Sequence, residues 1–334
     1  MVGLTGFSGL VALVELAAFL VFAALDMPLK SIAPPASRFP TPGSRLPTPV
    51  SRPPDSRYDS LVSGSSPSSA RALPRDVAEL KALAERQPEL ASAAQLQVSL
   101  IEAVRRVQGR LTTPWIETSS EALTARLAKG ESLLDFDQII FEWNDVRLLI
   151  RQIADILRRH DAIDADAVIA LHNVGRAADL PDRMRAWFAG TPSPDIEMLD
   201  EVLVWAARPY VQRTAEVLQQ RVNFDGWGRR TCPVCAAEPD FSLITMTGER
   251  QLVCGRCLVR WAFAATDCPF CGNQDRSTIT SMATPDGMYR VTICNPCGRY
   301  IKALDTRKSS RSLLPYADPI VTLPLDAAVM RRKT

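Results

Sequence analysis

The spacing of apolar residues predicts a long helical region in the middle of the chain. From Asp76 onward, leucines and valines recur every three or four residues, which is the period of a helix with one buried face. Another helix is predicted from Trp143 to about His160, and a further one begins at Ser193, where a capping hydroxyl precedes a proline and an acidic residue. Pro209 is expected to kink this last helix. We therefore predict an all-helical domain over residues 76–225.

The chain before this region has a different character. Residues 7–25 form an apolar run close to the length of a membrane span, and the stretch that follows is rich in proline and serine and contains a short tandem repeat. The first basic residue is Lys30, so the basic flank of a signal peptide is missing. We interpret residues 1–75 as a dispensable or wrongly assigned extension that includes a disordered segment; a membrane anchor and a cleaved signal are the alternatives.

The last third of the chain changes to short segments that read as strand, turn, strand. One such hairpin is predicted between Phe241 and Val253, and a second between Ser277 and Ile293. A Cys-x-x-Cys pair flanks each hairpin on both sides. The sequence thus predicts two ribbon-like units, the first over residues 226–265 and the second over residues 266–326 with the C-terminal tail.

All eight cysteines of the chain lie in these units, in four Cys-x-x-Cys pairs. Two thiolates separated by two residues can bind one metal ion from a tight turn, and two such turns complete a tetrahedral site of four sulfur ligands. The spacing is poor for a disulfide within a pair, which favours metal binding in a reducing compartment. The predicted metal ligands are Cys232, Cys235, Cys254, Cys257, Cys268, Cys271, Cys294 and Cys297.

The hairpins also predict which pairs share an ion. A hairpin brings its two ends together, so the first pair should join the second and the third should join the fourth. An interleaved arrangement stays open, because sequence alone does not fix connectivity. Gly272 and Gly298 follow the last cysteine of their pairs, where the first unit has Ala236 and Leu258. We expect the second site to be the better formed, since glycine accepts a positive φ.

Charge and composition restrict the function. The formal net charge is only +2. A divalent ion with four thiolates is negatively charged, so two such sites would cancel most of the positive excess of the cysteine units. The sequence therefore does not indicate a basic surface for nucleic acid. The two histidines, His160 and His172, have no partner cluster in the sequence. No nucleophile–base pair or open metal position is visible, so we predict that the protein is not an enzyme.

The cysteine segments resemble those of the FdhE-type formate dehydrogenase accessory proteins. The resemblance spans residues 76–330 and includes the C-terminal tail at 317–326. Its most specific part is Cys-Asn-Pro-Cys-Gly-Arg-Tyr-Ile-Lys at 294–302. Ala236 departs from the glycine usual in that family, and residues 1–70 match nothing in it. The other segments that carry the resemblance are Cys-Pro-Val-Cys at 232–235, Arg-Gln-Leu-Val-Cys-Gly-Arg-Cys at 250–257 with Trp261 downstream, and Cys-Pro-Phe-Cys-Gly at 268–272.

The resemblance implies a cytoplasmic chaperone-like accessory protein that binds the catalytic subunit of respiratory formate dehydrogenase and is required for its assembly or activation. It also implies an α+β fold in which an N-terminal all-helical domain is followed by two tandem rubredoxin-like or zinc-ribbon-like metal-binding units. Iron is then expected in two mononuclear sites of four sulfurs, with zinc as the alternative. We expect no nucleic acid, no small-molecule substrate and no membrane contact. A rubredoxin-like electron-transfer protein and a zinc-ribbon nucleic-acid-binding protein are the alternative functions.

Overall fold

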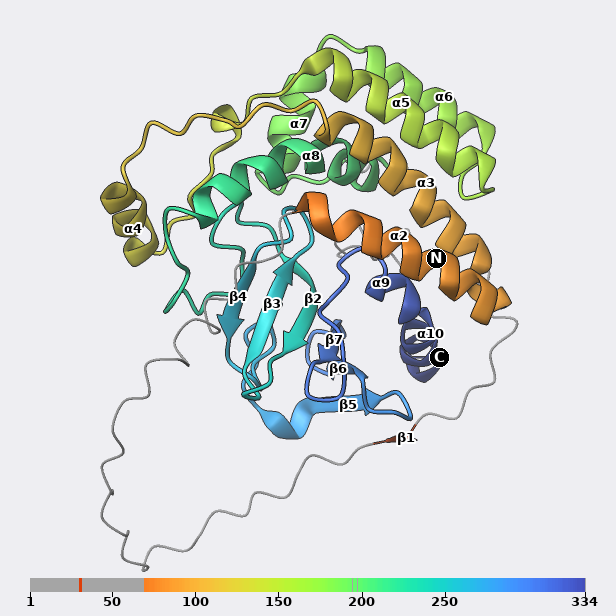
Figure 1. The fold of residues 1–334 in the computed structure, drawn as a ribbon, viewed down its shortest axis with the longest axis vertical. Helices are drawn as coiled ribbons and strands as arrows, with labels where there is room; N and C mark the ends of the chain where they lie inside the picture. Colours follow the sequence, from red (N-terminus) through yellow and green to blue (C-terminus); the bar gives the residue numbers. More distant parts are fainter. Residues whose placement is uncertain (1–29, 32–68, 194, 197, 334) are drawn as a thin grey trace, which may run out of the picture.

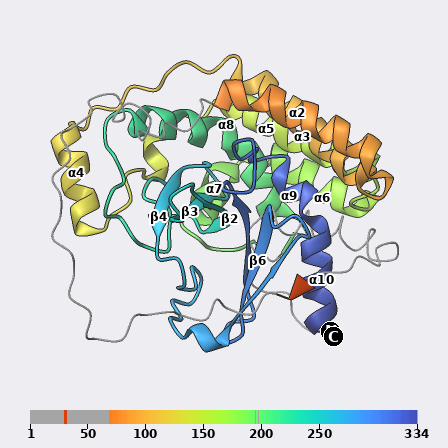
Figure 2. The same cartoon turned by 60° about the horizontal axis from the view of Figure 1, so that its bottom comes forward.

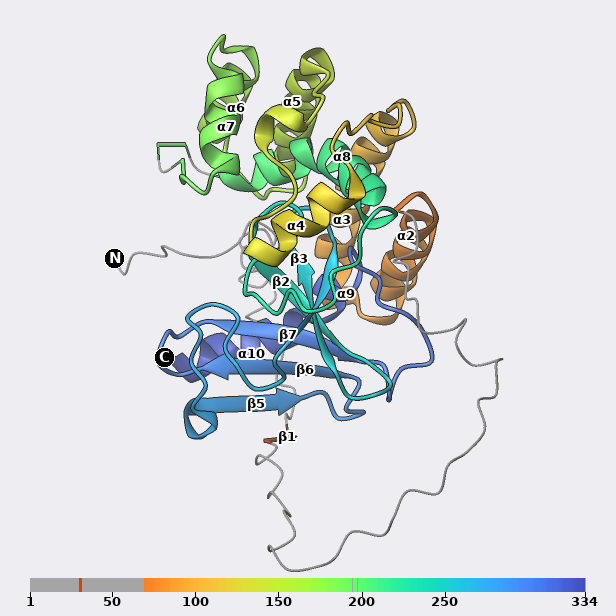
Figure 3. The same cartoon turned by 90° about the vertical axis from the view of Figure 1, so that its left-hand side faces the viewer.

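The computed structural model describes residues 30–31, 69–193, 195–196 and 198–333. They form the predicted α+β fold, with most helices at one end and a β-sheet with the C-terminal helix at the other (Figures 1 and 3). The predicted apolar run at residues 7–25 lies outside the described residues, as does most of the proline-rich stretch. Within the described ranges, no helix combines the length and apolar character needed to cross a membrane.

The helices pack around one shared core. α3 packs against α2, α5 and α8, and α5 also packs against α6 and α8. In Figure 1, α8 lies between α5 and the sheet. The elements are α2 (Ser69–Arg86), the 3-10 helix η1 (Pro88–Leu90), α3 (Ala91–Gln108), α4 (Ser120–Lys129), the 3-10 helix η2 (Phe136–Gln138), α5 (Trp143–Arg159), α6 (Ala165–Arg176), α7 (Leu180–Phe188) and α8 (Leu199–Gln219).

The start of α8 differs from the sequence prediction. The helix begins at Leu199 rather than at Ser193, because Met198 takes a left-handed conformation with φ of 63° directly before it. The backbone N–H of Ser193 instead donates to the Asp200 carboxylate in the first turn, at 3.2 Å. Ser193 was expected to cap the helix, but its own backbone N–H is instead bound by the side chain of Asp200 in the helix. Pro209 lies inside α8, and the kink there stays a prediction.

The strands of both cysteine units belong to one sheet. The order of its strands in the described part of the chain is β1-β5-β6-β7-β2-β3-β4. Neighbours within each unit are antiparallel, whereas β2 pairs with β7 in parallel, from Phe241 opposite Lys302 to Ile244 opposite Asp305. The strands are β1 (Lys30–Ser31), β2 (Pro239–Ile244), β3 (Arg250–Cys254), β4 (Arg260–Phe263), β5 (Ile279–Ala283), β6 (Tyr289–Cys294) and β7 (Tyr300–Asp305), with the 3-10 helix η3 (Arg276–Thr278) before β5.

The C-terminal tail covers the second unit. It forms α9 (Asp318–Val321) and α10 (Leu323–Lys333), and α10 runs beside β6 (Figure 2). Leu325 and Val329 of α10 join a core with sheet residues such as Val291 and Leu304. The apolar face of the last helix thus completes the packing of the sheet.

A buried ion pair joins the tail to the sheet. Lys302 of β7 donates to the Asp326 carboxylate of α10 at 2.5 Å and to the carbonyl of Pro319 at 3.0 Å. The Tyr300 hydroxyl donates to the other Asp326 oxygen at 2.7 Å. Because Lys302 and Asp326 have exposed side-chain fractions of 5% and 1%, each charge depends on the other for compensation.

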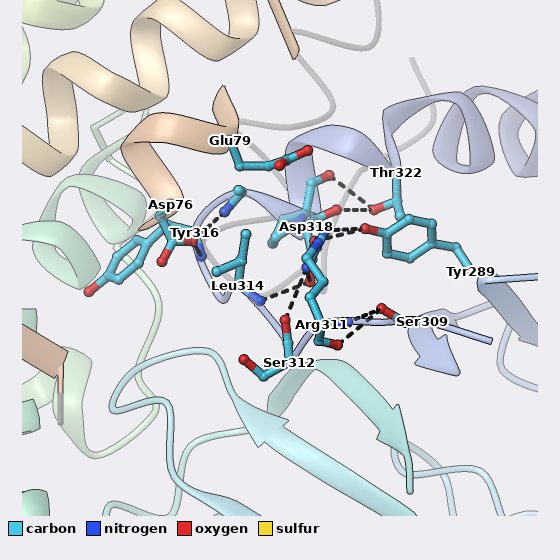
Figure 4. Close-up of polar contacts among 12 residues, drawn as sticks. Asp76, Glu79, Tyr289, Ser309, Arg311, Ser312, Leu314, Tyr316, Asp318 and Thr322 are labelled. Carbon is cyan, nitrogen blue, oxygen red and sulfur yellow. Dashed lines mark hydrogen bonds and ion pairs between the residues drawn. The ribbon is translucent and has the colours of Figure 1, made fainter. Parts of the chain in front are cut away.

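A second polar cluster ties the tail to the first described helix (Figure 4). Asp76 of α2 accepts hydrogen bonds from the backbone N–H groups of Tyr316 and Ala317, both at 2.8 Å. Asp318, which follows Ala317, accepts hydrogen bonds from the Tyr289 hydroxyl and from the Arg311 guanidinium, at 2.8 and 2.5 Å. The tail is therefore held between α2 and the second cysteine unit.

Candidate metal centres

The four Cys-x-x-Cys turns share one backbone geometry. In each turn, the N–H of the residue after the second cysteine donates to the carbonyl of the first, at 2.8–3.1 Å. That residue has a positive φ in all four turns: 56° at Ala236, 61° at Leu258, 78° at Gly272 and 68° at Gly298. The turn thus imposes a left-handed conformation even where the residue is not glycine, at a cost on the order of 1 kcal/mol for each non-glycine residue.

The first and second turns bring four thiols together. The Sγ atoms of Cys232 and Cys257 lie 3.5 Å apart, those of Cys235 and Cys254 lie 3.5 Å apart, and those of Cys235 and Cys257 lie 3.6 Å apart. Four sulfurs at about 2.3 Å from a central ion would lie roughly 3.8 Å from one another in a tetrahedron. We call this group the first cluster, and its donor set and spacing fit a metal ion.

The third and fourth turns form an equivalent second cluster. The Sγ atoms of Cys268 and Cys297 are 3.7 Å apart, and those of Cys271 and Cys294 are 3.6 Å apart. The predicted grouping of the thiols is therefore confirmed, and the interleaved alternative is wrong. The expectation of a better-formed second site is not met, because the thiols of the first cluster are equally close.

Backbone N–H groups already point at the sulfurs. Val234 and Arg256 direct backbone N–H groups at the Sγ atoms of Cys232 and Cys254, at 3.4 and 3.3 Å. Burial raises the pKa of the Cys232 thiol. In the second cluster, a hydrogen bond from the Asn273 backbone lowers the pKa of Cys271 to about 7. A bound metal ion would offset the cost of the buried thiolates, because the ion binds the deprotonated form.

The helical end of the molecule encloses the first cluster. The backbone N–H groups of Leu133 and Leu134 donate to the carbonyls of Pro233 and Val234, at 3.0 and 2.9 Å. On the other side, Arg208 of α8 donates to the carbonyl of Gly255 at 2.7 Å. Both turns of the first cluster are thus hydrogen-bonded to the helical part.

Arg256, between the ligands Cys254 and Cys257, completes this enclosure. Its guanidinium lies 4.3 and 4.5 Å from the ring centroids of Trp187 and Phe188 and donates to the carbonyls of Phe188 and Cys235. An open groove of about 810 Å³ runs past this arginine. Because Cys235 has no exposed surface, the groove gives solvent no access to its sulfur.

Both histidines contact a side chain of another helix, which the sequence did not reveal. The His160 Nε2 lies 3.1 Å from the Ser99 hydroxyl, and the His172 Nε2 lies 2.9 Å from Asp155. The Ser99 hydroxyl also donates to the carbonyl of Gln95, one turn earlier in α3. Because that bond uses the hydroxyl proton, the contact with His160 ties α3 to the end of α5 and does not form an activated nucleophile.

The aromatic residues of the cysteine units mainly serve packing. Trp261 is buried, and its indole N–H donates to the carbonyl of Arg229 at 2.8 Å. Tyr300 is buried against Asp326. Phe270 is partly buried, and the Arg299 guanidinium lies 3.7 Å from its ring centroid.

Comparison with known proteins identifies several relatives. The chain is 30% identical over 134 residues to a protein FdhE homolog of Aquifex aeolicus (strain VF5), which covers 38% of this chain and 47% of the relative. It is 26% identical over 216 residues to the protein FdhE of Escherichia coli O9:H4 (strain HS), covering 61% of this chain and 68% of that protein. The chain thus matches about half of one relative and two thirds of the other. No family model matches the chain.

Among solved structures, the fold is similar to the crystal structure of the FdhE protein from Pseudomonas aeruginosa. The TM-score is 0.55 at 19% sequence identity, and the match covers 78% of this chain and 91% of that chain. At this identity the similarity concerns the fold. It extends over most of both chains and so includes more than the cysteine units.

Proposed function

Since this chain is an FdhE-type protein, we propose that it is an accessory protein for the assembly or activation of respiratory formate dehydrogenase. The observation that carries the proposal is the contact between Lys302 and Asp326. Lys302 ends the segment that most specifically resembles the family, at 294–302, and Asp326 ends the matching tail at 317–326, so their ion pair joins the two segments in the folded protein. Two separate matching segments of the sequence thus belong to one structural unit of this chain, which supports the family assignment of the cysteine units as a whole.

The proposal includes one metal ion in each cluster, held by the eight cysteines. We propose iron in both, with zinc as the alternative, because four thiolates suit either metal. While bound, the ion would crosslink the two turns of its unit. Cys254 and Cys294 end the strands β3 and β6, so this crosslink would hold the ends of each hairpin in one arrangement.

We propose that the protein acts by presenting a rigid surface to its client, the catalytic subunit of formate dehydrogenase, in the cytoplasm. Units held by metal ions and by the shared sheet lose little conformational freedom when a partner binds, which lowers the cost of association. The contact of His160 with Ser99 supports this proposal, because helix packing explains it and the Ser99 hydroxyl proton is already donated to Gln95.

A rubredoxin-like electron-transfer protein is the second candidate. The exposure of Cys271 favours it, because electron exchange with a partner requires an accessible edge of the metal site. This function predicts a reversible one-electron couple at the second cluster.

Deletion of the gene tests the proposed function directly. We expect formate-dependent respiratory activity to be lost while the transcript of the catalytic subunit persists. Co-purification should recover that subunit with the intact protein, and cysteine replacements should weaken its recovery. Normal formate dehydrogenase activity in a deletion strain without a paralogue would reject the accessory role and favour electron transfer.

A further inference from the structure

The two clusters have similar sulfur spacing but very different surroundings. All four cysteines of the first cluster are buried, with exposed fractions from 0% to 4%. In the second cluster, Cys268 and Cys294 are buried, whereas Cys271 is exposed and Cys297 is intermediate. An ion at the second cluster would therefore have two ligands within reach of solvent, and an ion at the first cluster would have none.

The first cluster is part of the main hydrophobic core. Its four cysteines belong to the same group of buried residues as Leu100 and Val104 of α3 and Trp205 of α8. Opening it would disrupt the hydrogen bonds of Leu133 and Leu134 to the first turn and the stacking of Arg256. Such an opening exposes core residues and so has a free energy near that of larger-scale unfolding.

The second cluster is held by contacts within its own unit and by polar contacts with the first unit near the surface. The Asn273 side chain donates to the Thr278 hydroxyl at 2.8 Å, and the Asn295 backbone N–H donates to the carbonyl of Thr278 at 3.0 Å. On the exposed side, the Arg230 guanidinium donates to the carbonyl of Phe270. In this turn Phe270 packs against the main core but is only partly buried, so movement of the turn exposes less apolar surface than opening the first cluster does, and a local opening is sufficient.

From this asymmetry we propose that the second cluster is an exchangeable metal site, whereas the first cluster retains its ion as long as the protein is folded. The ligand of the exchangeable site is a thiophilic divalent ion such as Fe²⁺ or Zn²⁺. In the exchange, a nitrogen or thiolate donor of a chelating acceptor would replace the Cys271 thiolate first and the other three cysteines afterwards. The freed cysteines would take up protons from solvent, and the oxidation state of the metal would stay unchanged.

The inference rests on the proposed binding of metal at both clusters. It adds a difference in function: the first ion belongs to the permanent core, and the second can be taken up or handed over without unfolding. Protein that binds no metal would reject both proposals. Protein that binds two ions with equal kinetics would reject only the exchange.

Release of metal to a chromophoric chelator tests the exchange. Folded full-length protein carrying Zn²⁺ at both clusters is mixed with excess 4-(2-pyridylazo)resorcinol, and the absorbance of the complex is followed. We expect one ion to leave in a fast phase and the other at least about tenfold more slowly, because the second release needs a larger opening. Alkylation during the fast phase should modify Cys268, Cys271, Cys294 and Cys297 and spare the other four.

Two variants assign the phases. Cys271→Ser should remove the fast phase and keep the slow one, and Arg256→Ala should accelerate only the slow phase. Should Cys271→Ser fail to fold, the alkylation pattern of the unaltered protein decides the question. A single phase that releases both ions, or a fast phase that alkylates Cys232, Cys235, Cys254 or Cys257, would overturn the proposal.

Discussion

Glu238 and Arg299 form a two-point ion pair between the two cysteine units, with N···O distances of 3.0 and 2.7 Å. Glu238 follows the first turn of the first cluster, and Arg299 directly follows the last turn of the second. Arg299 also stacks on Phe270, within the third turn. The units therefore meet at their cysteine ends as well as through the parallel pairing of β2 with β7, and they form one structural body.

Loss of the buried Lys302–Asp326 pair should strongly destabilise the protein. Lys302→Met would leave Asp326 buried without its cation, and we expect a loss of about 3–5 kcal/mol in the free energy of unfolding. Urea denaturation followed by circular dichroism measures it. The matched control is Glu238→Gln, which removes only the ion pair with Arg299; the Glu238 and Arg299 side chains are 44% and 21% exposed, so the loss should stay below about 1 kcal/mol. Equal losses in both variants would contradict the assigned role of Lys302.

The backbone conformation after each cysteine pair predicts that two substitutions have opposite effects on stability. Ala236→Gly should stabilise the protein by up to about 1 kcal/mol, because glycine relieves the left-handed strain at φ of 56°. Gly272→Ala, at φ of 78°, should destabilise it by about 1 kcal/mol. Both can be read from thermal unfolding of the metal-loaded protein. Stabilisation by Gly272→Ala would show that these turns do not have the described geometry.

Asp76 predicts a specific pH dependence of stability. Burial raises its pKa from 3.8 to about 7, although two backbone N–H groups donate to it. Between about pH 4 and pH 7 the folded protein keeps this proton while the unfolded chain releases it, so the contribution of Asp76 to stability is lost as the pH rises.

Asp76→Asn removes this titration and keeps an oxygen that can accept both hydrogen bonds. The free energy of unfolding of the variant, minus that of the unaltered protein, should therefore increase by on the order of a few kcal/mol from about pH 5 to about pH 8. The comparison uses unfolding free energies at the two pH values. A constant difference between the two proteins would show that Asp76 does not titrate in this range.

The cysteine clusters could be predicted because their determinants are local. Each hairpin lies between the two pairs that it joins, so strand and turn signals over a short segment were sufficient to group the thiols. The advantage expected from Gly272 and Gly298 was not found, because the surrounding turn imposes a positive φ on Ala236 and Leu258 as well.

The relationships that the sequence did not reveal are long-range. The parallel pairing of β2 with β7 joins segments about sixty residues apart, and Asp76 contacts Tyr316 from the other end of the described chain. The arginine in Cys-Gly-Arg-Cys gave no signal of its role, because its partners Trp187 and Phe188 belong to α7. Such contacts depend on how the helical part lies against the sheet, which periodicity does not specify.

The metal content of anaerobically purified protein tests the central claim most directly, and elemental analysis of the intact chain and of two single variants measures it. The account predicts two ions per chain, mainly iron, with visible thiolate-to-iron absorption. Cys232→Ser and Cys268→Ser should each lose one ion, and the two variants should lose different ones. A colourless protein with two zinc ions would keep the architecture and remove the iron assignment. Folded protein with one ion or none, or loss of the same ion in both variants, would contradict the two-site account.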